Sequence, residues 1–213
     1  MLLACTCLRA CGKLFSYLWR DQRTMGVLTL ITGGARSGKS SFAEELIRSA
    51  YTQVAYIATA QIFDQEMEER VRRHRQQRPD HWTTYEESCA PSSVFPLFDN
   101  TVDAVLLDCL TVLTTNLILQ EQGMDWEAPD QVKLNAIEDR VMLEIENLLA
   151  ACSRFSGKVF LVTNEVGLGI VPASPLSRFF RDCSGRVNQC VAARADMVYM
   201  VISGIPVKIK GEE

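Results

Sequence analysis

The run Gly33-Gly34-Ala35-Arg36-Ser37-Gly38-Lys39-Ser40 decides the fold class of this chain, because it satisfies every fixed position of the phosphate-binding pattern G-x-x-x-x-G-K-[ST]. An apolar run, 27–31, precedes it, and a stretch compatible with a helix, 41–50, follows it. A strand, a glycine-rich loop and a helix in this order form the setting in which the pattern binds nucleoside triphosphates, and a chance glycine-rich turn is the alternative. We therefore predict a nucleotide-binding phosphate loop.

The chemistry of such a loop assigns a role to each of its parts. Its backbone N–H groups converge on the β-phosphate at a helix N-terminus, where the helix dipole also favours negative charge. Lys39 is expected to reach the β- and γ-phosphate oxygens and to act in catalysis, and the Ser40 hydroxyl is expected to bind Mg²⁺ as the cofactor. The predicted nucleotide-binding residues of the loop are Gly33, Gly34, Ala35, Arg36, Ser37, Gly38, Lys39 and Ser40.

Composition and charge narrow the class of protein. The chain has 213 residues, 47% of them apolar, and a net charge of −4, which argues against a general nucleic-acid binder. No apolar run approaches the roughly 18–20 residues that span a bilayer, so we expect no membrane span and a cytoplasmic location. The eight cysteines are scattered rather than arranged as a disulfide framework. We expect reduced thiols in a cytosolic fold at Cys89, Cys109, Cys152, Cys183 and Cys190.

The first 24 residues differ from the rest of the chain. Cys5, Cys7 and Cys11 do not have a usual zinc-ligand spacing, and the short apolar stretches are interrupted by basic residues, unlike a signal peptide. We interpret residues 1–24 as an N-terminal extension, either a disordered or short helical appendage or the product of an upstream start codon with Met25 as the natural first residue. Residues 25–213 are then a single domain.

Strand-like and helix-like segments alternate after the phosphate loop. The strand-like segments are 53–58, 104–108, 158–164 and 197–203, and the helix-like segments are 64–77, 110–120 and 129–152. This alternation predicts an α/β fold of the P-loop NTPase type, with a mostly parallel, doubly wound sheet and the nucleotide at the carboxyl ends of the strands. Among folds of this type, the chain resembles the recombinase-like P-loop proteins.

Asp108 and His74 stand out beside the phosphate loop. Asp108 ends a buried strand, where it would hold Mg²⁺ with Ser40; the alternative is a plain cap of the next helix. His74 lies among five arginines in 70–78, and Arg70 and Arg78 each lie one helical turn from it. The arginines would bind triphosphate oxygens and disfavour the charged imidazolium, which leaves a neutral nucleophile able to form a phosphoramidate. The alternative is a solvated charged helix.

The chain resembles the bifunctional adenosylcobinamide kinase/adenosylcobinamide-phosphate guanylyltransferase family of cobalamin biosynthesis from about residue 28 to 210. The resemblance depends on several runs in order. They are the stretches 32–40, 56–60, Glu66-Met67 with Arg70, His74, Arg78-Pro79 and Trp82, then 107–111 with Asn116-Leu117, 162–167 with 169–172, 180–182, 185–189 and 203–208. The phosphate loop is common to many enzymes, whereas the whole series is specific.

This resemblance implies roles for further residues. It implies that His74 is the histidine that becomes guanylylated, and it gives His81 no catalytic role. It places around the nucleotide Thr59, Ala60, Gln61, Arg75, Gln76, Gln77, Arg78, Glu86 and Asp108. Glu86 would accept hydrogen bonds from guanine, although residue chemistry without the resemblance favours a loop carboxylate. Apart from the resemblance, the segment 164–169 follows a strand, so its polar residues would contact the corrinoid or orient a hydroxyl; the alternative is a simple turn. Arg178, Arg181 and Arg186 would neutralise phosphates or are solvated.

The implied function is a two-step transferase. Its kinase activity would phosphorylate adenosylcobinamide with ATP or GTP, and its guanylyltransferase activity would move GMP from GTP through His74 to adenosylcobinamide phosphate. The family also implies a homo-oligomer, a trimer. Two alternatives stay open: a single-function P-loop small-molecule kinase and a non-catalytic nucleotide-dependent switch.

Overall fold

The computed structural model describes residues 26–61, 69, 72 and 79–211. The N-terminal extension and most of the predicted helix 64–77, including His74, lie outside the described residues. Of that helix, Glu69 and Arg72 are described: both are helical, and their side chains form an ion pair of 2.7 Å one turn apart.

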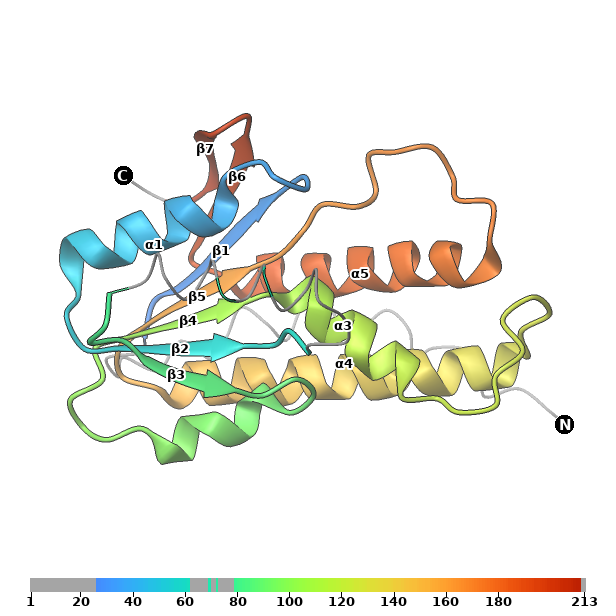
Figure 1. The fold of residues 1–213 in the computed structure, drawn as a ribbon, viewed down its shortest axis with the longest axis horizontal. Coiled ribbons are helices and arrows are strands. Elements are labelled where there is room, and N and C mark those ends of the chain that lie inside the picture. The colour runs from blue at the N-terminus through green and yellow to red at the C-terminus, as the bar shows by residue number, and fades with distance from the viewer. Residues whose placement is uncertain (1–25, 62–68, 70–71, 73–78, 212–213) are drawn as a thin grey trace, which may run out of the picture.

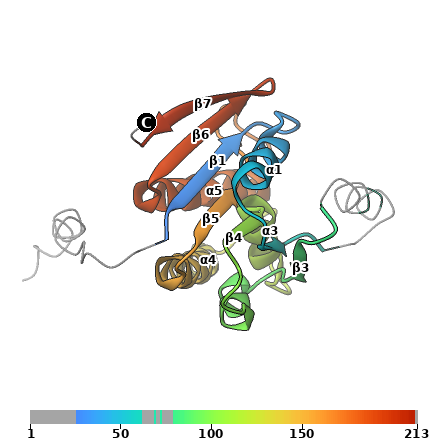
Figure 2. The ribbon, with the colours of Figure 1, turned by 90° about the vertical axis from the view of Figure 1, so that its left-hand side faces the viewer.

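The sheet has seven strands in the order β3-β2-β4-β5-β1-β6-β7. Its strands are β1 (Leu28–Gly33), β2 (Val54–Ala58), β3 (Thr83–Glu86), β4 (Ala104–Asp108), β5 (Lys158–Val162), β6 (Met197–Ile202) and β7 (Ile205–Lys210). All neighbours pair in parallel except β6 and β7, which are antiparallel. Figure 1 shows the parallel strands pointing to one edge, and Figure 2 shows β1 between β5 and β6.

Helices pack on both faces of the sheet. They are α1 (Lys39–Ala50), the 3₁₀ helix η2 (Pro91–Leu97), α3 (Leu110–Leu119), α4 (Gln131–Arg154) and α5 (Pro175–Arg194). Side chains alternate between faces along each strand, so Leu30 and Leu161 pack with α3, α4 and α5, while Ile31 and Val162 pack with α1. The two separate cores confirm the predicted doubly wound α/β fold.

Each predicted strand exists, with small shifts at its ends. The predicted strand 158–164 ends at Val162, yet the backbone stays paired beyond it, because Thr163 N–H donates to the Ile31 carbonyl and Glu165 N–H to the Gly33 carbonyl, both at 3.0 Å. The strands β3 and β7 were not predicted. They are the two edge strands of the sheet, and every residue of β7 is exposed. A two-residue turn at Ser203 and Gly204, with φ of 51° and 83°, joins β7 to β6.

Two compositional predictions can be compared with the described part of the chain. Cys89, Cys109, Cys152, Cys183 and Cys190 are all free thiols, as expected. In the residues that the structure describes, no helix is both long enough and apolar enough to cross a membrane.

Candidate nucleotide site

The phosphate loop connects the carboxyl end of β1 to the start of α1. Gly33 is required by close packing: a Cβ there would lie 2.5 Å from the Val201 carbonyl oxygen and 2.6 Å from Ser37 Oγ. Gly38 has a φ of 93°, a left-handed conformation that glycine adopts without strain. Two of the glycines in the pattern therefore serve the shape of the loop itself.

Neighbouring segments fix the loop through backbone hydrogen bonds. Ser37 N–H donates to the Gly34 carbonyl at 3.2 Å, which closes the loop on itself. The Ser37 carbonyl accepts from Gly204 N–H, in the β6–β7 turn, at 2.8 Å, and the Gly33 carbonyl accepts from Glu165 N–H at 3.0 Å. The loop is thus held from both neighbouring strands before any ligand binds.

Lys39 and Ser40 open α1 at the predicted positions. Lys39 is only 8% exposed, and its Nζ donates to the Gly34 carbonyl at 3.2 Å, so its charge lies within the loop. Ser40 is half-buried. Ser37 Oγ is buried and has no hydrogen bond within the described structure. An unpaired hydroxyl inside the loop fits a site that receives a polar ligand.

Asp108 ends β4 at the same edge of the sheet as the loop. Asp108 and Ile31 are both register partners of Val162, so β4 and β1 reach the same level on either side of β5. The charges of Asp108 and Lys39 both act on the buried Cys109 thiol. Its pKa is raised to about 12, mainly by burial and then by Asp108, while Lys39 opposes the rise. Asp108 and Lys39 therefore share one neighbourhood.

The residues present suit Mg²⁺. Hydroxyl and carboxylate oxygens are the donors that Mg²⁺ prefers, and Ser40 and Asp108 supply one of each. Neither side chain has a hydrogen bond to the described residues, so both oxygens are available to a ligand. Within the described residues, no group of three His, Cys, Asp or Glu side chains could hold a metal by protein ligands alone. This sparse donor set matches an ion that keeps waters and phosphate oxygens as its other ligands.

The residues outside the loop that are predicted to surround the nucleotide also reach this edge. Ala58 is the register partner of both Glu86 and Asp108, so the ends of β3, β2 and β4 lie in one row. Glu86 is exposed there, and is the last residue of an edge strand rather than a loop residue. Gln61, which follows β2, donates to Ser88 Oγ at 2.6 Å. Thr59, Ala60, Gln61, Glu86 and Asp108 therefore lie at the same edge of the sheet as the loop, with β3 four strands away from β1.

Thr59 has a structural role within this row. It is fully buried, and its Oγ1 donates to the Cys109 carbonyl at 2.9 Å and accepts from Cys109 N–H at 2.8 Å. The Asp108–Cys109 peptide bond is cis. The Thr59 N–H also donates to the Asp108 carbonyl at 3.3 Å. Because the hydroxyl and the backbone N–H of Thr59 are both used here, its neighbours Ala60 and Gln61 are the parts that can face a nucleotide.

Asn116 is a supporting residue to which the sequence reasoning gave no role. Its amide donates to the Thr59 carbonyl at 2.8 Å and to the Ser88 carbonyl at 2.9 Å, so α3 holds the segments after β2 and β3. Asn116 is 7% exposed. The sequence signal for this role was a polar amide within the mostly apolar stretch 110–119, because a buried polar group usually has hydrogen-bond partners.

The segment after β5 is anchored just as firmly. Thr163 Oγ1 donates to Asn188 Oδ1 at 2.7 Å, and Asn188 Nδ2 donates to the Asn164 carbonyl at 3.0 Å. Asn164 N–H donates to Thr111 Oγ1 at 2.7 Å. Glu165 Oε1 accepts from Gly167 N–H at 2.7 Å and so closes its own turn.

The three arginines of α5 that could neutralise phosphates bond to the protein instead. Arg178 donates to the carbonyls of Pro172 and Ala173, Arg181 pairs with Asp182 at 2.9 Å, and Arg186 pairs with Glu138. These pairs favour a structural role over phosphate neutralisation. His74, Arg75, Gln76, Gln77 and Arg78 lie outside the described residues, and the other histidine, His81, is exposed.

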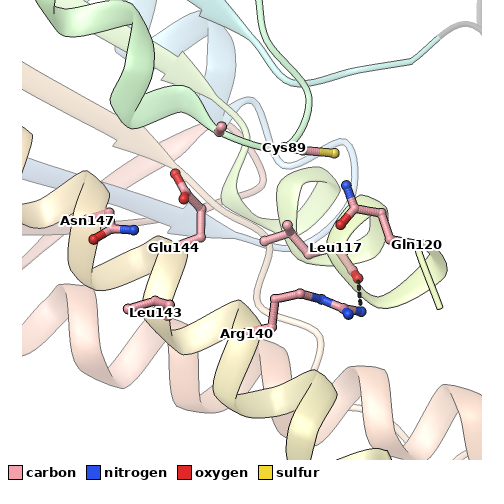
Figure 3. A pocket seen from close by; sticks show the side chains of 8 residues that line it. Cys89, Leu117, Gln120, Arg140, Leu143, Glu144 and Asn147 are labelled. Atoms are coloured by element: carbon pink, nitrogen blue, oxygen red, sulfur yellow. Dashed lines mark hydrogen bonds between the residues drawn. The ribbon is translucent and has the colours of Figure 1, made fainter.

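A separate pocket of about 280 Å³ lies among α3, α4 and the turn before η2 (Figure 3). Arg140 lies at this pocket, and its Nη2 donates to the Leu117 carbonyl at 3.1 Å. None of the predicted site residues lines it. The lining residues are Cys89, Ala90, Leu117, Gln120, Arg140, Leu143, Glu144 and Asn147.

Fold and site together define a P-loop nucleotide-binding α/β protein. The chain belongs to the cobinamide kinase / cobinamide phosphate guanyltransferase family (CobU), whose model matches residues 29–209. It is 50% identical over 184 residues to the bifunctional adenosylcobalamin biosynthesis protein CobU of Escherichia coli K12, covering 86% of this chain and 100% of that one.

Two other relatives agree with this. The CobU of Salmonella typhimurium LT2 is 49% identical, again over 86% of this chain and 100% of the relative. The bifunctional adenosylcobalamin biosynthesis protein CobP of Pseudomonas aeruginosa PAO1 is 40% identical over 86% of this chain and 97% of its own. Among solved structures, the RadB recombinase matches with a TM-score of 0.44 and 16% identity, over 83% of this chain and 74% of that one. The family assignment depends on the family model and the sequence relatives, and not on this structural match.

Proposed function

We propose that this protein phosphorylates adenosylcobinamide with ATP or GTP and then transfers GMP from GTP to adenosylcobinamide phosphate, giving adenosylcobinamide-GDP. The observation that carries the proposal is the alignment of the phosphate loop, Asp108 and Glu86 along one edge of the sheet. Family membership supplies the acceptor, because the matching family is described by its cobinamide kinase and cobinamide phosphate guanyltransferase activities.

In the kinase reaction, the substrate hydroxyl oxygen attacks the γ-phosphorus, and the bond from that phosphorus to the β–γ bridging oxygen breaks. ADP or GDP leaves, and the hydroxyl proton is released. The loop N–H groups and Lys39 hold the β- and γ-phosphates and offset the charge that moves to the leaving oxygen. Mg²⁺, held by Ser40 and Asp108 when bound, would supply further charge neutralisation on the phosphates.

In the guanylyl transfer, a neutral ring nitrogen of His74 attacks the α-phosphorus of GTP, and pyrophosphate leaves. A phosphate oxygen of adenosylcobinamide phosphate then attacks the same phosphorus, the P–N bond breaks, and His74 is restored. Glu86 is the proposed guanine partner, because a carboxylate accepts from both N–H groups on one edge of that base. We further propose that the protein works as a trimer, which light scattering in solution would test.

Labelling with GTP tests the covalent step directly. The unsubstituted protein (the parent) and two variants, His74→Ala and His81→Ala, are each incubated with Mg²⁺ and α-labelled GTP and then denatured. The proposal expects acid-labile, base-stable label on the parent and on His81→Ala, none on His74→Ala, and none from γ-labelled GTP. His81→Ala is the matched control, since it removes the chain's other histidine, an exposed one.

Each other result contradicts part of the proposal. A parent that binds GTP but takes no label is a single-function kinase or a nucleotide switch, and phosphorylation of cobinamide separates those two. Label that persists on His74→Ala moves the covalent step to another residue.

A further inference from the structure

The segment after β5 lies between the two halves of the phosphate site. In the sheet, β5 is flanked by β1, which leads into the phosphate loop, and by β4, which ends at Asp108. Residues 163–165 continue parallel pairing along β1, with Thr163 N–H on the Ile31 carbonyl and Glu165 N–H on the Gly33 carbonyl. Asn164 therefore lies at the edge where the phosphates are expected, two residues past Val162, which is the register partner of both Asp108 and Ile31.

Strand alternation places Asn164 on the face of the phosphate loop. Val162 packs in the core under α1, whereas the Thr163 side chain reaches Thr111 of α3 and Asn188 of α5 on the opposite face. Because the backbone remains extended and paired through Glu165, Asn164 returns to the face of Val162 and α1. Lys39 begins α1, so Asn164 and Lys39 share this face.

The backbone of Asn164 is fixed while its side chain is not engaged. Its N–H donates to Thr111 Oγ1 at 2.7 Å, and its carbonyl accepts from Asn188 Nδ2 at 3.0 Å. Its carboxamide has no hydrogen bond to any residue that the structure describes. The neighbouring Glu165 differs, because its carboxylate closes the turn at Gly167. A rigid backbone that presents a half-buried, unused amide is the arrangement of a ligand contact.

We propose that the Asn164 side-chain amide donates a hydrogen bond to the γ-phosphoryl group of the bound nucleoside triphosphate. This inference depends on the proposed triphosphate site and deepens it, by naming a residue that tells a triphosphate from a diphosphate. The Lys39 ammonium and the loop N–H groups serve the β-phosphate as well, whereas Asn164 reaches the site from the neighbouring strand. An amide donor suits a phosphoryl oxygen, since it has two hydrogens and no charge that must be desolvated.

The test compares two ligands in two variants. Binding of the non-hydrolysable β,γ-imido analogue of ATP and of ADP, each with Mg²⁺, is measured by calorimetry for the parent, Asn164→Ala and Asn147→Ala. We expect Asn164→Ala to bind the triphosphate analogue about 10-fold more weakly or worse, with ADP affinity unchanged within about twofold. Asn147 lies exposed on α4, and its variant controls for loss of an asparagine amide elsewhere.

The outcomes separate this inference from the proposed function. Equal weakening of both ligands would assign Asn164 to support of the loop, and unchanged binding of both would remove it from the site; either result overturns the inference. A parent that binds neither nucleotide overturns the inference and the proposed function together. A selective loss in Asn164→Ala supports the inference even where the parent fails to phosphorylate cobinamide, a failure that counts against the proposed function alone.

Discussion

The Thr59 hydroxyl is bonded to both backbone groups of Cys109, donating to its carbonyl at 2.9 Å and accepting from its N–H at 2.8 Å. These two bonds join the residue after β2 to the residue after β4. One side chain thereby fixes the position of Asp108 relative to the residues that follow β2.

Replacing Thr59 by valine keeps the shape of the side chain and removes both bonds. The buried Cys109 N–H then loses its partner, while the Cys109 carbonyl keeps the bond from the Leu113 N–H at 3.1 Å. We therefore expect a loss of about 1–3 kcal/mol in the free energy of unfolding. For a chain of this size, that corresponds to a fall in Tm of roughly 2–4 °C for each kcal/mol. Urea unfolding of Thr59→Val measures it.

Thr29→Val is the matched control for that substitution. Thr29 is 1% exposed, and its Oγ1 has no hydrogen bond within the described structure, so the same change removes an unpaired hydroxyl. We expect Thr29→Val to be neutral or stabilising. Equal destabilisation in the two variants would contradict the role given to the Thr59 bonds.

Gly38→Ala is expected to damage nucleotide binding. At φ 93° an L side chain is strained, and the new Cβ would lie 3.3 Å from Gly204 Cα, a backbone atom that cannot rotate away. We expect a loss of about 1–2 kcal/mol in stability and at least a ~10-fold weaker affinity for the triphosphate, because the loop N–H groups are displaced. Thermal unfolding and calorimetry measure the two effects.

Gly123→Ala separates backbone strain from damage to the site. Gly123 also has a positive φ, 72°, but a Cβ there meets nothing within 4 Å. This variant should lose stability on the same scale and bind nucleotide like the parent. Nucleotide affinity equal to the parent's in Gly38→Ala would refute the packing argument.

Asp108→Asn is expected to remove the benefit of Mg²⁺. The amide keeps the size of the side chain but lacks the charge that favours the cation. We expect triphosphate affinity in EDTA to match the parent's, and the gain on adding Mg²⁺ to fall by about 10-fold or more. Asp139→Asn, an exposed carboxylate on α4, should leave the gain intact. A full gain in Asp108→Asn would exclude Asp108 as a magnesium ligand.

The buried thiols predict a loss of stability in alkali. Burial raises the pKa of Cys152, like that of Cys109, to about 12, well above the usual range of a thiol. Between about pH 9 and 12 the unfolded chain releases these protons while the folded chain retains them, so each thiol lowers stability by ~1.4 kcal/mol per pH unit. Below about pH 9 this effect is absent.

Unfolding in urea from pH 8 to 10.5 measures that slope. Cys152→Ala should show a shallower decline with pH than the parent, although its stability at pH 8 is lower because of the cavity it leaves. The same burial should leave Cys109 and Cys152 unmodified by iodoacetamide at pH 8 in the folded protein. An unchanged slope in Cys152→Ala would contradict the assignment.

The sequence predicted the centre of the sheet well and its edges poorly. The strands β1, β4 and β5 are short apolar runs buried on both faces, a pattern that Leu106 and Leu161 illustrate. In contrast, β3 consists of Thr83, Thr84, Tyr85 and Glu86, with no buried residue and no clear alternation. Its strand structure comes from pairing with β2, which its own composition does not encode.

The candidate site likewise contains some residues that the sequence predicted and others that it did not. The phosphate loop and Asp108 were predictable, because fixed spacing and a strand end determine where those groups lie. Asn116 and Asn188 were not assigned roles, because their function depends on partners far along the chain, the Thr59 and Asn164 carbonyls. The roles given to His74 and Arg75 stay predictions, since both lie outside the described residues.

The position of β1 in the middle of the sheet has a consequence for biosynthesis. It is the first strand of the described chain to leave the ribosome, yet both of its neighbours, β5 and β6, are translated much later. The Gly204 N–H that holds the Ser37 carbonyl comes later still. A nascent chain therefore carries the whole phosphate-loop sequence before the strands and the turn that hold the loop are translated, and we expect nucleotide binding only after translation has passed the β6–β7 turn.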